Sequence, residues 1–438
     1  MSRATAAAAD PLANLAYPDA VVTESAPDAV VTVVGVDAAG APPHPALAPA
    51  LAGAGLVVGA ARHLATVSVP PGVDTVVLGP LAPAVRRLNA AVAAGVPAVV
   101  LASGDPGLFG IVRRLRAAGL PLRVVPAVSS VAAAFARAGL PWDGAAVVTA
   151  HGRDPRPALN ACRALPLVAV LTAPGVGAAE LGAGLVGWSR RLVVAEHLGT
   201  DAERVRAATP EQAAAGTWSD PHVLLSIAAP GPAAPAPDLV APDGMRADNQ
   251  PAAAPAGGWA LPEDRYAHRD SMITKSEVRA LVVARLRPRL GRLIWDVGAG
   301  SGSVGIECAL LGAAVLAVEQ HSASAATIRD NAAVHAVDVR VVVGRAPAAL
   351  DGLPEPDAVF VGGGGTDVLT AVVARRPERV VLTLAALDRV APAVGLLRAA
   401  GYTVEGSQLS AARLADLPGG SIRLAATNPV VVLTGERP

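Results

Sequence analysis

The stretch from residue 293 to 307 combines an apolar run, a dense glycine turn and the start of a helical pattern. Gly298, Gly300 and Gly302 can adopt positive φ angles and let the backbone approach a ligand closely. The helix expected after them would offer its unpaired N-terminal amides to that ligand. The next apolar run ends at Glu319, at a spacing where a carboxylate can bind both hydroxyls of a ribose. These residue types and spacings predict a site for an adenosine derivative.

The residue before the turn indicates which adenosine derivative is bound. Gly300, Gly302 and Gly305 also satisfy the dinucleotide pattern G-x-G-x-x-G, so a dinucleotide-dependent oxidoreductase is an alternative. Asp296 would lie near the negative pyrophosphate of a dinucleotide, whereas it suits the ammonium and sulfonium groups of S-adenosylmethionine. We therefore favour S-adenosylmethionine. A glycine-rich turn without a ligand is the remaining alternative.

The composition disfavours several classes of function. The 438 residues suffice for two or three domains, and Lys+Arg and Asp+Glu both total 36, so no overall field would attract nucleic acid or an anionic membrane. Cys162 and Cys308 lack the spacing of metal ligands. No export signal or apolar run of membrane-spanning length is evident. We expect a cytoplasmic enzyme with no metal ion, no nucleic-acid partner and no membrane association.

Shifts in composition divide the chain into four parts. Residues 1–28 are rich in alanine without a helix or strand pattern, which predicts a mobile tail, and the proline-rich residues 229–260 predict a linker. Two α/β domains are then expected at 29–228 and 261–438. In the second, apolar runs alternate with helical stretches, which predicts a doubly wound parallel sheet with ligands beyond the carboxyl ends of its strands. The expected strands are 292–297, 314–319, 339–343, 357–361, 379–384 and 429–434.

Four motifs of the second domain resemble a known family. Residues 272–279 (MITKSEVR), 295–304 (WDVGAGSGSV), 344–347 (GRAP) and 356–364 (PDAVFVGGG) are similar to the decarboxylating precorrin methyltransferase domain of cobalamin biosynthesis, which has a Rossmann-like fold. The run from 382 to 388 departs from the family pattern. The resemblance implies contacts with S-adenosylmethionine from the residues Thr274, Gly298, Ala299, Gly300, Ser301, Gly302, Glu319 and Ala346.

The first domain resembles the tetrapyrrole methylase family, in the branch that methylates carbon 5. The resemblance rests on residues 101–110 (LASGDPGLFG), 126–130, 135–142 and 149–153, in that order. It implies two αβ lobes with S-adenosylmethionine between them, near Gly35 and the turn Ser103, Gly104 and Asp105. Asp37 departs from the family's usual opening glycine motif. This departure motivates the alternative that the first domain is only a tetrapyrrole-binding module.

Together the two resemblances imply one fused enzyme that methylates carbons 5 and 15 of a precorrin and removes carbon dioxide from the ring C acetate. Lys275, the only lysine in the chain, and His321 are candidate catalytic groups, because a nearby cation or proton donor would stabilise the charge released by decarboxylation.

The tetrapyrrole substrate carries many carboxylates, so arginine and histidine side chains are expected to bind it. Arg62, His151 and Arg153 are the candidates within family-like motifs. The resemblance also implies a homo-oligomer. A cobalt-containing ring stays open as an alternative to the metal-free substrate.

Overall fold

The structure is a computed structural model that describes residues 30–36, 44–152, 154–220, 222–229, 259–269 and 273–438. The expected tail at 1–28, nearly all of the expected linker at 229–260, Asp37 and Arg153 lie outside these residues. The chain divides between Ala133 and Ala134 into two compact units, which are described separately.

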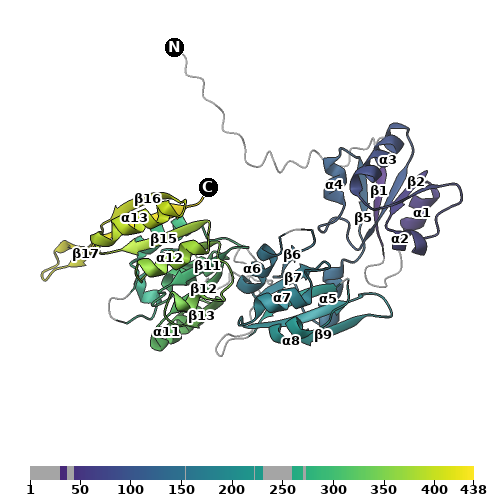
Figure 1. Cartoon of the computed structure of the whole chain (residues 1–438). Coiled ribbons are helices and arrows are strands. Elements are labelled where there is room, and N and C mark those ends of the chain that lie inside the picture. The colour runs from purple at the N-terminus through teal and green to yellow at the C-terminus, as the bar shows by residue number, and fades with distance from the viewer. Residues whose placement is uncertain (1–29, 37–43, 153, 221, 230–258, 270–272) are drawn as a thin grey trace, which may run out of the picture. The chain divides into compact units, whose positions relative to one another are not determined.

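The first unit is built on a sheet of five parallel strands in the order β3-β2-β4-β1-β5 (Figure 1). The strands are β1 (Val31–Val36), β2 (Leu56–Gly59), β3 (Asp74–Val77), β4 (Ala98–Ser103) and β5 (Leu122–Val125). The helices are α1 (Leu47–Ala52), α2 (Ala61–Thr66), α3 (Leu81–Ala93) and α4 (Val112–Ala117), and α5 (Ser130–Ala138) spans the division between the units. Alternate residues of β1 enter two different buried clusters, so both faces of this sheet are covered, as parallel sheets require.

The second unit begins with a mixed sheet of five strands in the order β6-β7-β10-β8-β9. Its elements are β6 (Ala146–Thr149), α6 (Arg156–Ala164), β7 (Leu167–Leu171), α7 (Ala178–Leu185), β8 (Arg190–Glu196), β9 (Arg204–Ala208), α8 (Pro210–Ala215) and β10 (His222–Ala228). Only the pairing of β6 with β7 is parallel.

The second unit continues with a seven-stranded sheet in the order β13-β12-β11-β14-β15-β19-β16. Its strands are β11 (Leu293–Val297), β12 (Ala314–Glu319), β13 (Val339–Val343), β14 (Ala358–Val361), β15 (Arg379–Leu384), β16 (Thr403–Leu409) and β19 (Val430–Glu436). The helices are α9 (Ser276–Leu286), α10 (Ser303–Leu310), α11 (Ser322–Val334), α12 (Thr366–Ala374) and α13 (Val390–Ala399), with short 3₁₀ turns η2 (Glu263–Arg265), η3 (Ala348–Leu350) and η4 (Leu387–Arg389). A separate hairpin consists of β17 (Ala412–Asp416) and β18 (Ile422–Ala426).

The predicted α/β fold class is confirmed, and each of the six expected strands is present with bounds that shift by two residues at most. The parallel direction expected for the last of them is wrong, because β19 runs antiparallel to β15 and to β16. Parallel neighbours need a crossover connection, usually a helix, whereas only the hairpin lies between β16 and β19.

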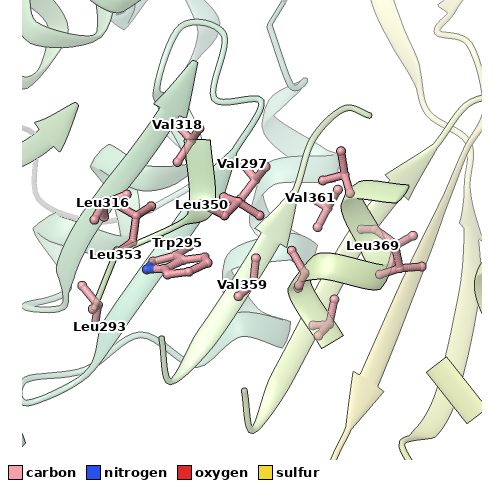
Figure 2. Close-up of a cluster of buried hydrophobic side chains, with 14 of the residues drawn as sticks. Leu293, Trp295, Val297, Leu316, Val318, Leu350, Leu353, Val359, Val361 and Leu369 are labelled. Carbon is pink, nitrogen blue, oxygen red and sulfur yellow. The ribbon is translucent and has the colours of Figure 1, made fainter. Parts of the chain in front are cut away.

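Trp295 lies at the centre of the main buried cluster of the seven-stranded sheet (Figure 2). Leu293, Trp295 and Val297 belong to this cluster, whereas Ile294 belongs to the cluster on the opposite face. The indole nitrogen of Trp295 donates to the carbonyl of Pro354 at 3.1 Å, so its one polar atom is satisfied. By the same alternation, the side chain of Asp296 belongs to the face opposite Trp295.

Within the second unit, residues of the mixed sheet contact the seven-stranded sheet directly. Trp188 is buried in the same cluster as Trp295. Arg190, whose side chain is fully buried, donates to Asp338 at 2.8 Å, and the amide of Asn160 donates to the carbonyl of Gly291 at 3.0 Å. These two parts therefore share one interface. None of the described helices combines the length and the apolar character that spanning a membrane requires.

Candidate functional site

The glycine turn after β11 has the backbone conformation that the sequence predicted. Gly298, Gly300 and Gly302 have φ angles of 75°, 58° and 77°, which side chains rarely adopt. A Cβ atom on Gly298 would lie 3.0 Å from the amide nitrogen of Gly363, and one on Gly302 would lie 2.8 Å from the side chain of Ile328. A Cβ atom on Gly300 would meet nothing within 4 Å. The turn is therefore closely packed at both ends and open in the middle.

A cavity of about 410 Å³ lies beside this turn, beyond the carboxyl ends of β11 and β12. This is the place at which parallel sheets of this class bind ligands. The structure brings six of the predicted site residues together in its wall, namely Gly298, Gly300, Ser301, Glu319, His321 and Ala346. The size falls within the range of pockets that bind cofactors and other small molecules.

Glu319 is buried, and both of its carboxylate oxygens are positioned by backbone amides. Its Oε2 accepts from the amide of Gly300 at 2.9 Å, and its Oε1 accepts from the amide of His321 at 2.9 Å. A carboxylate oxygen can accept more than one hydrogen bond, so both oxygens keep capacity for a pair of neighbouring hydroxyls. The geometry fits the ribose-binding role expected of Glu319.

Asp296 lies behind the turn and lines neither this cavity nor the adjacent one. Its Oδ2 accepts from the amide of Gly305 at 2.9 Å, whereas its Oδ1 has no hydrogen-bond partner in the described part of the chain. Complete burial, with a smaller contribution from the negative charge of Glu319, raises the pKa of Asp296 to about 7. In this position the carboxylate links the end of β11 to the first turn of α10.

The other residues predicted for this site lie in a second cavity or outside both. Thr274, Lys275 and Ala299 line a cavity of about 540 Å³ that shares Gly298, Gly300 and Ser301 with the first one. Gly302 lines neither cavity and is the N-cap residue that precedes α10. Lys275 and His321, the two candidate catalytic residues, therefore line different cavities.

A buried ion pair fixes the segment that carries Thr274. The side chains of Arg279 and Glu307 are both fully buried, and the Nε of Arg279 donates to Glu307 at 2.6 Å. Arg279 also donates to the carbonyl of Thr274 at 2.6 Å. Glu307 further accepts from the amides of Ala260 and Leu261 and from the hydroxyl of Tyr266. This network ties the start of α9 to α10, which follows the glycine turn.

A separate candidate site lies at the carboxyl ends of β1 and β4 in the first unit. A Cβ atom on Gly35 would lie 2.1 Å from the carbonyl oxygen of Gly104, so only glycine fits there. The Oγ of Ser103 accepts from the Nη2 of Arg62 at 2.8 Å, and the ring of His63 lies 3.0 Å from the same Oγ. Two predicted residues of different roles, Ser103 and Arg62, are therefore in contact.

The side chain of Asp105 stabilises the turn after β4 through a hydrogen bond within that turn. Oδ1 of Asp105 accepts from the amide of Gly107 at 2.8 Å, and Gly104 has a φ angle of 57°. His151 belongs to the second unit, is exposed, and its amide donates to the hydroxyl of Thr149 at 3.1 Å.

Several residues that line the cavities were not predicted from the sequence. Gln320, Arg345 and Asp367 line the first cavity, and Thr383 and Asn428 line the second. Arg345 lies within the motif at 344–347, so the sequence motif already marked the segment that lines the first cavity. Asn428 precedes an antiparallel strand, and no sequence motif marks it.

Two family models match separate parts of the chain. A family model described as "Tetrapyrrole (Corrin/Porphyrin) Methylases" matches residues 45–214, and one described as "Precorrin methyltransferase domain" matches residues 264–433. Both family resemblances that the motifs predicted are thus confirmed, in the predicted order.

Relatives of two lengths match the chain. A precorrin-6Y C(5,15)-methyltransferase (decarboxylating) from Sinorhizobium sp is 38% identical over 72% of this chain and 74% of its own length. A protein of the same name from Mycobacterium tuberculosis is 33% identical over 78% of this chain and 79% of its own length. A probable cobalt-precorrin-6B C(15)-methyltransferase (decarboxylating) from Pyrobaculum calidifontis is 34% identical over 40% of this chain and 94% of its own length.

Proposed function

Since this chain belongs to the family of precorrin-6Y C(5,15)-methyltransferases (decarboxylating), we propose that it methylates precorrin-6Y at carbons 5 and 15 and removes carbon dioxide from the ring C acetate, giving precorrin-8X in cobalamin biosynthesis. The part at 261–438 carries out methylation at carbon 15 and decarboxylation, and the part at 29–228 carries out methylation at carbon 5. The dinucleotide-dependent oxidoreductase considered above is no longer supported, because both family models describe methyltransferases.

The observation that carries the proposal is the cavity beside the glycine turn. S-adenosylmethionine, when bound, supplies a methyl group on a positively charged sulfur that is a good leaving group. Glu319 holds the ribose hydroxyls with both carboxylate oxygens, and the open middle of the turn at Gly300 lets the backbone approach the cofactor. Ser301 and Ala346 complete the wall next to it, and His321 lies on the same side.

Alignment and exclusion of water are the main tasks of these residues. An electron-rich ring carbon needs only to be held in line with the methyl group, and such orientation supplies several kcal/mol towards a reaction barrier. Gly298 and Gly300 line both cavities, so a cofactor in the first and a substrate in the second would lie next to the same turn. Asp296 supports the turn from behind through Gly305.

In the first unit we assign cofactor binding to Gly35, Ser103, Gly104 and Asp105. The near contact of Gly35 with Gly104 brings two backbone segments together without side chains between them, and the Asp105 turn fixes the loop after β4. Arg62 is assigned to a substrate carboxylate, and His151 and Arg153 are assigned to substrate binding separately; the support for these assignments is the family resemblance.

The test is mass spectrometry of the tetrapyrrole after the full chain is incubated with S-adenosylmethionine and precorrin-6Y. A gain of two methyl groups with loss of one carbon dioxide is expected. A product with one methyl group and the carboxyl group lost would make the first half a binding module only. In that case an Asp105→Ala variant would give the same product as the unaltered chain, whereas an active first half would lose methylation at carbon 5.

The substrate without cobalt is the better supported form. The relatives that match both halves are named for precorrin-6Y, whereas the relative named for a cobalt precorrin matches 40% of this chain. The same incubation with the cobalt-containing ring distinguishes the two, because the proposal expects the metal-free ring to have the higher kcat/KM.

We also propose a homo-oligomer in the cytoplasm. The hairpin of β17 and β18 exposes Leu414, Ile422 and Leu424 to 71%, 62% and 67%, and large apolar side chains gathered on one hairpin are typical of a contact surface. Light scattering of the full chain and of a Leu414→Glu variant tests the assembly. The variant should have the lower mass.

A further inference from the structure

The second cavity adjoins the same glycine turn, and several helices and strands contribute to its wall. It shares Gly298, Gly300 and Ser301 with the cavity assigned to the cofactor. The rest of its wall comes from Ala299, from the starts of α9 and α10, from the ends of β14 and β15, and from the two chain segments that flank the hairpin of β17 and β18. A ligand there would therefore lie next to the same turn as the cofactor.

Several polar residues and one cationic residue line this cavity. Thr274, Thr383 and Asn428 offer hydroxyl and amide groups, and Lys275 offers an ammonium group. No hydrogen bond or ion pair of the Lys275 side chain is found among the described residues. Glu277 also lines the cavity, so the balance of charge there depends on what its carboxylate binds.

The charge of Glu277 is compensated by Arg413 of the hairpin. The Nε of Arg413 donates to Oε1 of Glu277 at 2.8 Å, and its Nη2 donates to Oε2 at 2.5 Å. Arg413 also donates to Glu263 at 2.7 Å. These contacts hold the pKa values of both glutamates below their usual range, and that of Glu263 falls to about 2. Two carboxylates bound by one guanidinium leave Lys275 as the cation available to a ligand of the cavity.

We propose that this second cavity binds a carboxylate side chain of the tetrapyrrole next to the carbon that is methylated, and that Lys275 is its anchoring residue. The inference rests on the proposed function and assigns different tasks to the two candidate catalytic residues, since His321 lines the cofactor cavity instead. Lys275 then acts in substrate binding, through a charge-assisted hydrogen bond to the carboxylate.

Arg413 is a positioning residue in this arrangement, because it acts through Glu277. If Arg413 is removed, the carboxylate of Glu277 is free to pair with Lys275 or to repel the substrate. The amide and hydroxyl of Thr427 both donate to the carbonyl of Ala411, at 2.9 and 3.1 Å, so the base of the hairpin keeps its own hydrogen bonds after that change.

The experiment measures binding of precorrin-6Y to the full chain by absorbance titration without S-adenosylmethionine, together with KM and kcat for formation of the carbon 15 product. Lys275→Met should raise Kd and KM for the tetrapyrrole about tenfold or more, which is the usual effect of losing a hydrogen bond to a charged group. Lys275→Arg should recover part of the loss. Binding of S-adenosylmethionine should stay unchanged and thereby report an intact fold. Arg285→Met, on the same helix outside the cavity, is the matched control.

A second variant pair tests the role of the neighbouring charges. Arg413→Ala should raise Kd for the tetrapyrrole, and the double variant Arg413→Ala with Glu277→Gln should restore it, which a purely structural role of Arg413 would not produce. The inference is overturned if Lys275→Met binds precorrin-6Y as tightly as the unaltered chain. If the unaltered chain neither binds nor methylates precorrin-6Y, the proposed function itself fails.

Discussion

Replacing Glu307 by glutamine should destabilise the C-terminal sheet strongly, although the two side chains have nearly the same shape. Glu307 is fully buried and accepts four hydrogen bonds, from Arg279, Leu261, Tyr266 and Ala260. A glutamine has one acceptor oxygen, and its NH₂ group would point at a donor in either orientation. The guanidinium of Arg279 would keep its burial and lose its counter-charge.

The expected cost follows from that unpaired charge. Removing one partner of a buried ion pair costs about 3–5 kcal/mol. For a domain of this size, 1 kcal/mol lowers the melting temperature by about 2–4 °C, so a decrease of about 6–20 °C is expected. Thermal unfolding of the full chain, followed by tryptophan fluorescence, measures it, since Trp295 lies in the core of this sheet.

Two further variants make the reasoning refutable. Arg285→Ala removes an exposed ion pair with Glu405 at 2.8 Å and should cost less than about 1 kcal/mol. The double variant Arg279→Met with Glu307→Leu removes both charges and should be less destabilised than Glu307→Gln alone. The reasoning is wrong if Glu307→Gln unfolds within 2 °C of the unaltered chain, or if the double variant is the least stable of the three.

Three further changes have distinct expected outcomes. Gly35→Ala should abolish methylation at carbon 5 and leave carbon 15 methylated, because the new Cβ would lie 2.1 Å from a backbone carbonyl. The control Gly79→Ala adds a Cβ in open space, and mass spectrometry should find both methylations unchanged. Burial raises the pKa of Asp296 from 3.8 to about 7, so its contribution to stability is complete below about pH 3.8 and is lost as the pH rises to about 7. Asp296→Asn should remove this part of the decline between pH 4 and 7. The difference in melting temperature between the variant and the unaltered chain measures the effect. Asp338→Ala should cost about 3–5 kcal/mol because it leaves a buried arginine unpaired, whereas Asp351→Ala, at a side chain that is 86% exposed, should cost less than about 1 kcal/mol in the same unfolding assay.

The sequence predicted the elements whose residues are buried on both sides. Strands β11 and β12 are continuous apolar runs bounded by glycine or acidic residues, and this pattern fixed their bounds within a residue. Strand β16 and the hairpin were not predicted, because β16 is mostly exposed and carries no alternation. Its position next to β19 depends on pairing with a distant segment, and a local pattern holds no information on such pairing.

The candidate site divides in the same way. Glu319 was predicted because, in this type of sheet, a carboxylate at the end of the second strand lies where it can bind the ribose hydroxyls. Asp296 was expected at the cofactor; its side chain accepts from the amide of Gly305 in α10 and lines neither of the two cavities. The pairing of Arg279 with Glu307, 28 residues apart, had no local signal, although it holds the segment that carries Thr274.

The glycine turn explains why one short segment can serve two ligands. Gly298 and Gly302 are glycine because neighbouring atoms leave no room, whereas the space beside Gly300 is empty. Gly300 lines both the cavity of Glu319 and the cavity of Lys275. A side chain there would meet no protein atom within 4 Å, so packing does not require glycine at this position, whereas its positive φ angle favours glycine. Gly300 and Gly302 belong both to the dinucleotide pattern and to the turn beside the cavities. These two glycines by themselves therefore do not distinguish a dinucleotide site from a methyltransferase site.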